Sequence, residues 1–187
     1  MITQNVTLDG AVEMLGDWFD AQGQGDQPDL TEEMRRQDAA ATAFLCGRRT
    51  FEDLRGYWRD LADDTTGVSD YLDGVDKYVV SSTLTEPAWD RTTVLSGDPV
   101  AEVAALKAAP APEGRDGTDI VLTGSIRLAH TLIAAGLADE YRQFVFPVVQ
   151  GAGRRFFPDG LALPRMETLE SRTFRSGLTL LRHRPVG

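Results

Sequence analysis

The chain has few of the side chains that hold metals or form disulfides. It contains one cysteine, Cys46, so no disulfide can form within it, and its two histidines, His130 and His183, lie far apart. Zinc sites need clustered Cys, His or acidic ligands, and no such spacing occurs. We therefore expect no metal site. The lone cysteine and the lack of a signal-peptide pattern after Met1 predict a cytoplasmic protein.

Long apolar runs and an excess of positive charge are also missing. No stretch approaches the roughly 20 apolar residues that span a bilayer. Acidic residues number 29 against 19 lysines and arginines, so the formal net charge of the 187 residues is −10. Such a charge repels nucleic acid and anionic lipid. We expect a small-molecule ligand, with no nucleic acid and no membrane, and a single domain over residues 1–187.

Strand and helix patterns alternate along most of the chain. Strands are predicted at the N-terminus, at residues 42–46 and 77–81, and in the segments TTVL, TDIVLTGS and DEYRQFVFPVV. Helices are predicted from Thr31, which would cap the first of them, over residues 48–58, in PVAEVAALKAA, and after Ser125, a second cap. Two strands around Ser176 and Gly177 form a hairpin. This order predicts an α/β sandwich, with helices on both faces of a mostly parallel sheet and an antiparallel C-terminal edge.

Three predicted strands end in small or hydroxyl residues, in CGRRT, VVSS and LTGS. Ligands of open α/β sheets bind beyond the carboxyl ends of the strands, and helix N-termini bind phosphate. The three ends therefore favour a ligand with several phosphates, held by Thr50, Ser81, Ser82, Ser125, Arg48 and Arg49. A plainer alternative is that these are ordinary helix caps, with the two arginines paired to Glu52 and Asp53. The Walker and G-x-G-x-x-G fingerprints are absent.

The order and spacing of TLDG, LCGRRTFEDLRGYW, KYVVSSTL and LTGSIRLAHTLIAAGLADEYRQFVFPVVQGAGRRFF resemble the dihydrofolate reductase-like superfamily. Within it, the chain most resembles the C-terminal reductase domain of riboflavin biosynthesis deaminase-reductases, including stand-alone members. The resemblance implies a three-layer αβα sandwich that binds NADPH. No deaminase half is expected, because its zinc motif cannot be built from one cysteine.

The resemblance also implies which residues hold the cofactor. Gly47, Arg48, Arg49 and Thr50 would lie at its phosphates, with Arg48 favoured for the 2′-phosphate. The adenosine half would meet Ser81 and Ser82, the pyrophosphate Thr123, Gly124, Ser125 and Ile126, and the nicotinamide Asn5 through Gly10. Dihydrofolate reductases have a cis Gly-Gly bond at the pyrophosphate turn. Thr123 disfavours a cis bond here, because a cis peptide without proline costs about 3 kcal/mol.

Residues on the substrate side are predicted less directly. Dihydrofolate reductases carry an acid on the helix after the lid loop, where this chain has Asp29, Glu32, Glu33 and Asp38; each could equally be a solvated charge. Asp9 is the catalytic candidate, although an Asp-Gly turn needs no function. Trp18 and Phe19 could stack on a flat heterocycle or anchor the loop.

Two functions follow from these expectations. The first is an NADPH-dependent reductase of a small planar heterocycle, a pterin or a pyrimidinone as in riboflavin biosynthesis, working by hydride transfer from nicotinamide. The alternative is a non-catalytic NADP(H)-binding or sensing protein on the same fold. Either could be a homodimer joined by the apolar C-terminal segments FVFPVV and LTLL.

Overall fold

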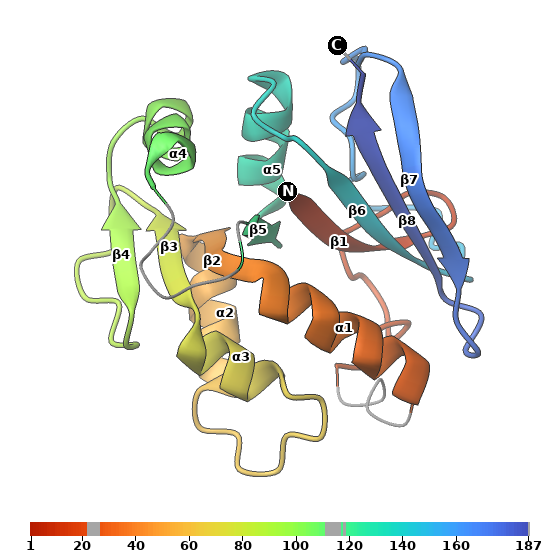
Figure 1. The fold of residues 1–187 in the computed structure, drawn as a ribbon, viewed down its shortest axis with the longest axis horizontal. Helices are drawn as coiled ribbons and strands as arrows, with labels where there is room; N and C mark the ends of the chain where they lie inside the picture. The colour runs from red at the N-terminus through yellow and green to blue at the C-terminus, as the bar shows by residue number, and fades with distance from the viewer. Residues whose placement is uncertain (22–26, 111–116, 118, 187) are drawn as a thin grey trace.

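The computed structural model describes residues 1–21, 27–110, 117 and 119–186. At its centre is an eight-stranded sheet with the order β4-β3-β2-β5-β1-β6-β8-β7 (Figure 1). Neighbours from β4 to β6 are parallel, whereas β8 is antiparallel to β6 and to β7. The predicted parallel sheet with an antiparallel C-terminal edge is confirmed.

The strands and helices follow the predicted alternation. The strands are β1 (Ile2–Thr7), β2 (Ala41–Gly47), β3 (Asp76–Val80), β4 (Thr92–Leu95), β5 (Asp119–Thr123), β6 (Tyr141–Phe146), β7 (Met166–Thr173) and β8 (Thr179–Pro185). The helices are α1 (Pro28–Ala40), α2 (Arg48–Trp58), α3 (Val68–Gly74), α4 (Pro99–Ala108) and α5 (Ile126–Ala134). The hairpin predicted at Ser176 and Gly177 joins β7 to β8.

Helices cover both faces of the sheet, as the alternating side chains of β2 show. Leu45 packs in the cluster that contains Val103 of α4 and Leu132 of α5. Its neighbour in β2, Phe44, packs in the opposite cluster with residues of α2 and α3. Because successive side chains of a strand point to opposite faces, the sheet lies between two helical layers. The predicted three-layer arrangement is confirmed.

The first helix begins earlier than predicted. Thr31 was expected to be its N-cap, but α1 starts at Pro28 after an N-cap at Gln27, and Thr31 is buried within the first turn. Proline suits this place, because its fixed φ matches the helix and its missing N–H would have no partner there. The hydroxyl of Thr31 is therefore not the cap.

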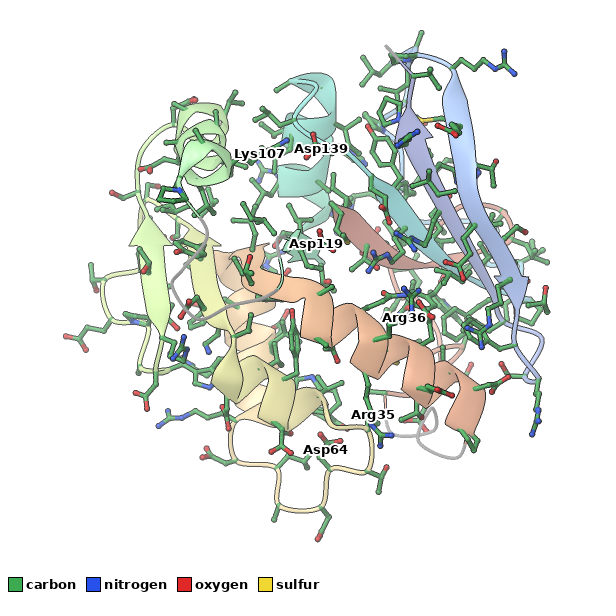
Figure 2. The ribbon with its side chains drawn as sticks, viewed as in Figure 1. Arg35, Arg36, Asp64, Lys107, Asp119 and Asp139 are labelled. Carbon is green, nitrogen blue, oxygen red and sulfur yellow. The ribbon has the colours of Figure 1, made fainter. Side chains whose placement is uncertain are left out.

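A surface contact ties α4 to the chain before β6. The ammonium group of Lys107 lies 2.6 Å from the carboxylate of Asp139 and donates to the Leu137 carbonyl (Figure 2). Within the described ranges, no helix is both long and apolar enough to cross a bilayer, and no group of three metal-binding side chains occurs.

Candidate functional site

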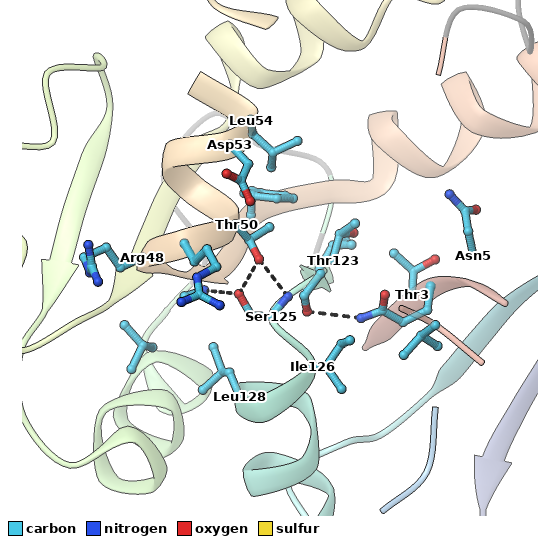
Figure 3. Close-up of a pocket in the computed structure, with 18 of the residues that line it drawn as sticks. Thr3, Asn5, Arg48, Thr50, Asp53, Leu54, Thr123, Ser125, Ile126 and Leu128 are labelled. Carbon is cyan, nitrogen blue, oxygen red and sulfur yellow. Dashed lines mark hydrogen bonds between the residues drawn. The ribbon is translucent and has the colours of Figure 1, made fainter. Parts of the chain in front are cut away.

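A cavity of about 1120 Å³ runs along the helical face made by α1 and α2 and reaches the carboxyl ends of β2, β3 and β5. The sheet order places β5 between β2 and β1. The helices that follow β2 and β5, α2 and α5, therefore begin side by side at this cavity (Figure 3). All eleven predicted cofactor residues line it: Asn5, Gly47, Arg48, Arg49, Thr50, Ser81, Ser82, Thr123, Gly124, Ser125 and Ile126.

A short hydrogen-bond network joins the two helix starts. The Gly47 amide donates to the Ser125 hydroxyl at 2.5 Å, and that hydroxyl donates to the Thr50 hydroxyl oxygen at 2.8 Å. The Ser125 amide donates to the same Thr50 oxygen at 2.9 Å (Figure 3). Because the Thr50 oxygen accepts twice, its own proton is left to donate into the cavity.

Two glycines allow this close approach. A Cβ on Gly47 would lie 2.9 Å from the Ser125 hydroxyl oxygen, and a Cβ on Gly124 would lie 2.5 Å from the Thr50 methyl carbon. Gly124 also has a φ of +73°, which favours glycine. The peptide bond between Thr123 and Gly124 is trans.

The helix starts are suited to an anion. Neither α2 nor α5 has a side chain bonded to its first-turn amides, so these amides are open to a ligand. Ser125 is the N-cap of α5 by position, as predicted. However, its side chain bonds to Gly47 and Thr50 rather than to its own helix. Phosphate oxygens would be natural partners for the amides and for the spare Thr50 proton.

The two arginines at the start of α2 differ in their surroundings. Arg48 forms an ion pair with Glu52 one turn later, with both oxygens at 3.1 Å, as the plainer alternative predicted. Exposed pairs of this kind contribute little free energy, so a phosphate could displace Glu52 at small cost. Arg49 is exposed and makes no side-chain bond to any residue that the structure describes. No pair with Asp53 forms.

The serines after β3 lie at the same cavity. The Ser81 hydroxyl oxygen accepts from the amides of Thr83 and Leu84 at 3.2 and 3.0 Å. Its proton is therefore available to the ligand or to Thr83. Ser82 is exposed and lines the cavity beside it.

At the other end, α1 contributes one acid, Asp38. Its carboxyl lines the cavity, is half-buried and receives no hydrogen bond from the described residues. Burial raises the pKa of Asp38 to about 7, against a smaller opposing effect of the Arg142 charge. Such a carboxyl holds a proton near neutral pH and can release it to a ligand.

The other three acids considered on this helix have different roles. Asp29 accepts from the amides of Leu30 and Arg175, and Glu33 is buried against Arg36, Gln37 and Arg172. Glu32 is exposed. Sequence alone could not separate Asp38 from these residues, because all four share one helix and only packing decides which face meets the cavity.

Other polar groups line the same cavity as Asp38. Arg142 of β6 is buried, donates to Gln37 at 2.8 Å and pairs with Glu140 at 3.1 Å, and both Arg142 and Gln37 line the cavity. Thr3 of β1 lines it too, and its hydroxyl oxygen is buried without a partner among the described residues. Arg142 and Thr3 were not predicted; a charge inside an apolar strand was the available signal for Arg142. Buried unpaired hydroxyls indicate a missing ligand atom or water.

The structure places Asp9, the catalytic candidate, outside the cavity lining. Its carboxylate accepts from the Thr7 hydroxyl at 2.6 Å and from the amides of Gln150 and Gly151 at 3.2 and 2.8 Å. These hydrogen bonds lower the pKa of Asp9 to about 2. Such a carboxylate joins two loops and holds no proton at neutral pH. Catalysis by Asp9 stays an untested prediction, and Asp38 has the better geometry.

The two aromatic candidates separate as well. Phe19 lines the cavity. Trp18 instead packs against Phe146 in a T-shaped arrangement, with ring centroids 5.1 Å apart, and its indole N–H donates to Gln150 at 2.7 Å. Trp18 thus anchors the loop, and Phe19 is the ring available to a ligand. Of the segment from Asn5 to Gly10, Asn5 lines the cavity.

The residues present fit nicotinamide adenine dinucleotide phosphate, NADP(H). Two helix starts, the spare Thr50 proton and an unpartnered Arg49 provide donors for its phosphates. Gly47 and Gly124 allow the two helix starts to lie close together, because a Cβ on either would clash with Ser125 or Thr50. The same cavity is also lined by Asn5 and Asp38.

Known proteins resemble this chain over most of its length. Residues 1–180 match the family model described as RibD C-terminal domain. The "Uncharacterized protein YyaP" of Bacillus subtilis is 32% identical over 182 residues, which is 92% of this chain and 87% of that protein.

Two solved structures share the fold. One, from Shewanella sp. PV-4, is described as a riboflavin biosynthesis protein; it has a TM-score of 0.67 and 18% identity over 100% of this chain and 98% of that one. A pyrimidine reductase-like protein from Corynebacterium diphtheriae has a TM-score of 0.65 and 14% identity over 100% and 91% of the two chains.

Proposed function

The chain belongs to the RibD C-terminal domain family, and on that premise we propose that it is an NADPH-dependent reductase of a small planar heterocycle, a pterin or a pyrimidinone. One observation carries the proposal. One cavity is lined by two helix starts whose first-turn amides have no side-chain cap, and also by the carboxyl of Asp38, whose pKa is raised to about 7.

Different residues along the cavity would bind different parts of NADPH. The starts of α2 and α5 bind the pyrophosphate, and Arg48 or Arg49 binds the 2′-phosphate through its planar fork of donors. Ser81 and Ser82 contact the adenosine half, and Asn5 lies toward the nicotinamide. A bound NADPH supplies a hydride for a carbonyl or imine carbon.

Asp38 would complete the reduction on the substrate side. Its neutral carboxyl donates a proton to the nitrogen or oxygen next to the reduced carbon, and Arg142 and Thr3 orient the ring edge by hydrogen bonds. Because the pKa of Asp38 is raised to about 7, the donor form is lost above that pH. We expect kcat/KM to fall as the pH rises past 7, and Asp38→Asn to remove that dependence together with most of the activity.

Titration of nicotinamide fluorescence with NADPH and NADH tests the cofactor assignment. Loss of a charge-assisted hydrogen bond costs about 1.5–3 kcal/mol, so Arg48→Ala should weaken NADPH binding roughly ten- to a hundredfold and NADH binding little. The NADPH affinity of Arg49→Ala, compared with that of Arg48→Ala, shows how much each arginine contributes to binding the 2′-phosphate. Arg59→Ala, beyond the end of α2 and away from the cavity, is the matched control. Binding of neither nucleotide below millimolar would refute the assignment.

Turnover separates the reductase from the alternative, a non-catalytic NADP(H) sensor. NADPH oxidation is followed at saturating nucleotide with pterin, pyrimidinone and flavin-precursor acceptors. Oxidation that depends on one acceptor supports the reductase, whereas tight binding without turnover across the panel supports the sensor.

Two further expectations belong to this proposal. We expect a homodimer joined by the C-terminal strands, which light scattering would test. We also expect a cytoplasmic location, which fractionation of the source cells would test.

A further inference from the structure

Beside the main cavity lies a smaller side chamber of about 90 Å³. Seven residues line both spaces: Asn5, Phe19, Ala21, Met34, Trp58, Val68 and Phe144. Four more line the chamber alone: Leu30, Thr66, Phe146 and Leu178. The chamber is therefore a branch of the cleft, placed between α1, β6 and the loop that carries Phe19.

The chemistry of the side chamber differs from that of the polar end around Asp38. Among the described residues, no charged side chain lines the chamber, and its polar side chains are Asn5 and Thr66. The Thr66 hydroxyl is already occupied, because it donates to Asp64 at 2.6 Å and accepts from the Val68 amide at 3.3 Å. A sugar or phosphate group placed there would leave most of its hydrogen bonds unmade, which is costly.

The walls are held firmly enough to define a shape. Leu30, Phe146 and Leu178 belong to one buried cluster and are 2%, 8% and 3% exposed. Trp58, in the cluster under α2, is 7% exposed. A water molecule occupies about 30 Å³ of liquid, and an apolar cavity of about 150 Å³ holds benzene. A space of 90 Å³ therefore suits a branched group of about four carbon atoms.

We propose that the side chamber is a specificity subsite for a compact apolar substituent on the heterocycle, of about the size of an isobutyl group. The proposal rests on the proposed function, because it requires the ring itself to lie in the main cavity near Asp38. The preferred substrate then has two unlike parts: a ring edge with hydrogen-bonding atoms, and an aliphatic branch in place of a sugar or phosphate chain.

The test compares matched ligands by isothermal titration calorimetry, with and without saturating NADP⁺. The probes are uracil, uracil with an isobutyl group at ring position 5 or 6, and the same rings with a hydroxyethyl group. Each buried methylene contributes about fourfold in affinity. One isobutyl probe should therefore bind at least tenfold tighter than uracil, up to an order of a hundredfold, and the hydroxyethyl probes should show no such gain.

Filling the chamber provides the structural control. Ala21 borders both spaces and has a small side chain, so Ala21→Phe should remove the isobutyl gain, measured as the ratio of isobutyl-probe affinity to uracil affinity in the same variant. Val68→Phe fills the chamber from α3 and should act in the same way. Ala162→Phe places the same ring on an exposed site away from both cavities and should leave every affinity unchanged.

Three results would overturn the proposal: equal affinities for the isobutyl and hydroxyethyl probes, no probe binding at all, or an isobutyl gain that survives both filling variants. If Ala21→Phe weakened NADPH binding and left the probe ratio unchanged, the chamber would hold part of the nucleotide and the proposal would also fall. Failure of NADPH to bind refutes the proposed function separately, because the probes are also compared without nucleotide.

Discussion

Asp38→Asn should change how stability depends on pH. The pKa of Asp38 is about 7 in the folded protein against an ordinary 3.8, because burial disfavours its charge. The folded state therefore binds more protons than the unfolded state between about pH 4 and 7. The free energy of unfolding falls as the pH rises through that window and is flat on either side of it for this group.

The size of the effect follows from the shift. About three pKa units correspond to about 4 kcal/mol at most. Water in the cavity should reduce this, so we expect about 2 kcal/mol. Asparagine cannot ionise and keeps the side-chain shape. Relative to the parent protein, the variant should therefore be more stable at pH 8 than at pH 4.5 by about that amount.

Urea denaturation followed by tryptophan fluorescence at both pH values measures the difference. Asp29→Asn on the same helix is the matched control, and its parent-minus-variant difference should be the same at pH 4.5 and pH 8, because both values lie above the ordinary pKa of 3.8. Backbone hydrogen bonds, first that from Arg175, lower the pKa of Asp29, so its contribution is present above its ordinary pKa and lost as the pH falls. A parent-minus-variant difference at Asp38 that is the same at both pH values would refute the reasoning.

Three other perturbations test separate parts of the structure. Gly124→Ala should destabilise the protein by about 2 kcal/mol or more in urea denaturation, because its φ is +73° and the new Cβ would lie 2.5 Å from the methyl group of Thr50. Gly136→Ala is the control, because its φ is +67° but its Cβ would meet open space, so it measures the cost of φ alone. Equal losses of stability in the two variants would exclude a contribution from the clash. Gln150 holds the loop before α1 through its side chain, so Gln150→Ala should speed hydrogen exchange of the Trp18 indole N–H, and unchanged exchange would argue against that role. Burial raises the pKa of Cys46 to about 12, so iodoacetamide at pH 8 should modify the native protein only as fast as it unfolds, and a fast reaction would contradict the burial.

Local signals in the sequence were enough to predict the phosphate-binding end. Gly47 and Thr50 follow a short apolar strand directly, and Ser125 follows another, so the chain fixes both helix starts within a few residues. Parallel strands have their carboxyl ends at one edge of the sheet, so the parallel arrangement alone predicts that the two helix starts lie at the same edge. The hydroxyl network between them was not predictable, because its partners are 75 and 78 residues apart.

The substrate end depends on packing that the sequence does not display. Asp38 differs from Glu32 and Glu33 only in the face of α1 that it occupies, and that face is set by how the helix lies on β2 and β6. The N-terminus of α1 was placed at Thr31 because a threonine before two glutamates is a typical cap, whereas Pro28 starts the helix one turn earlier. The two errors differ in cause: tertiary contacts select Asp38 among the acids of α1, whereas the helix start follows a local signal, the proline at its first position.

The contacts between the two helix starts also have an evolutionary consequence. Gly47 cannot gain a side chain while Ser125 keeps its hydroxyl, and Gly124 cannot gain one while Thr50 keeps its methyl group. Substitutions at these positions should therefore show strong epistasis. Gly47→Ala should be harmful alone and better tolerated together with Ser125→Gly, so in a library that varies these two positions, functional members should carry changes in pairs.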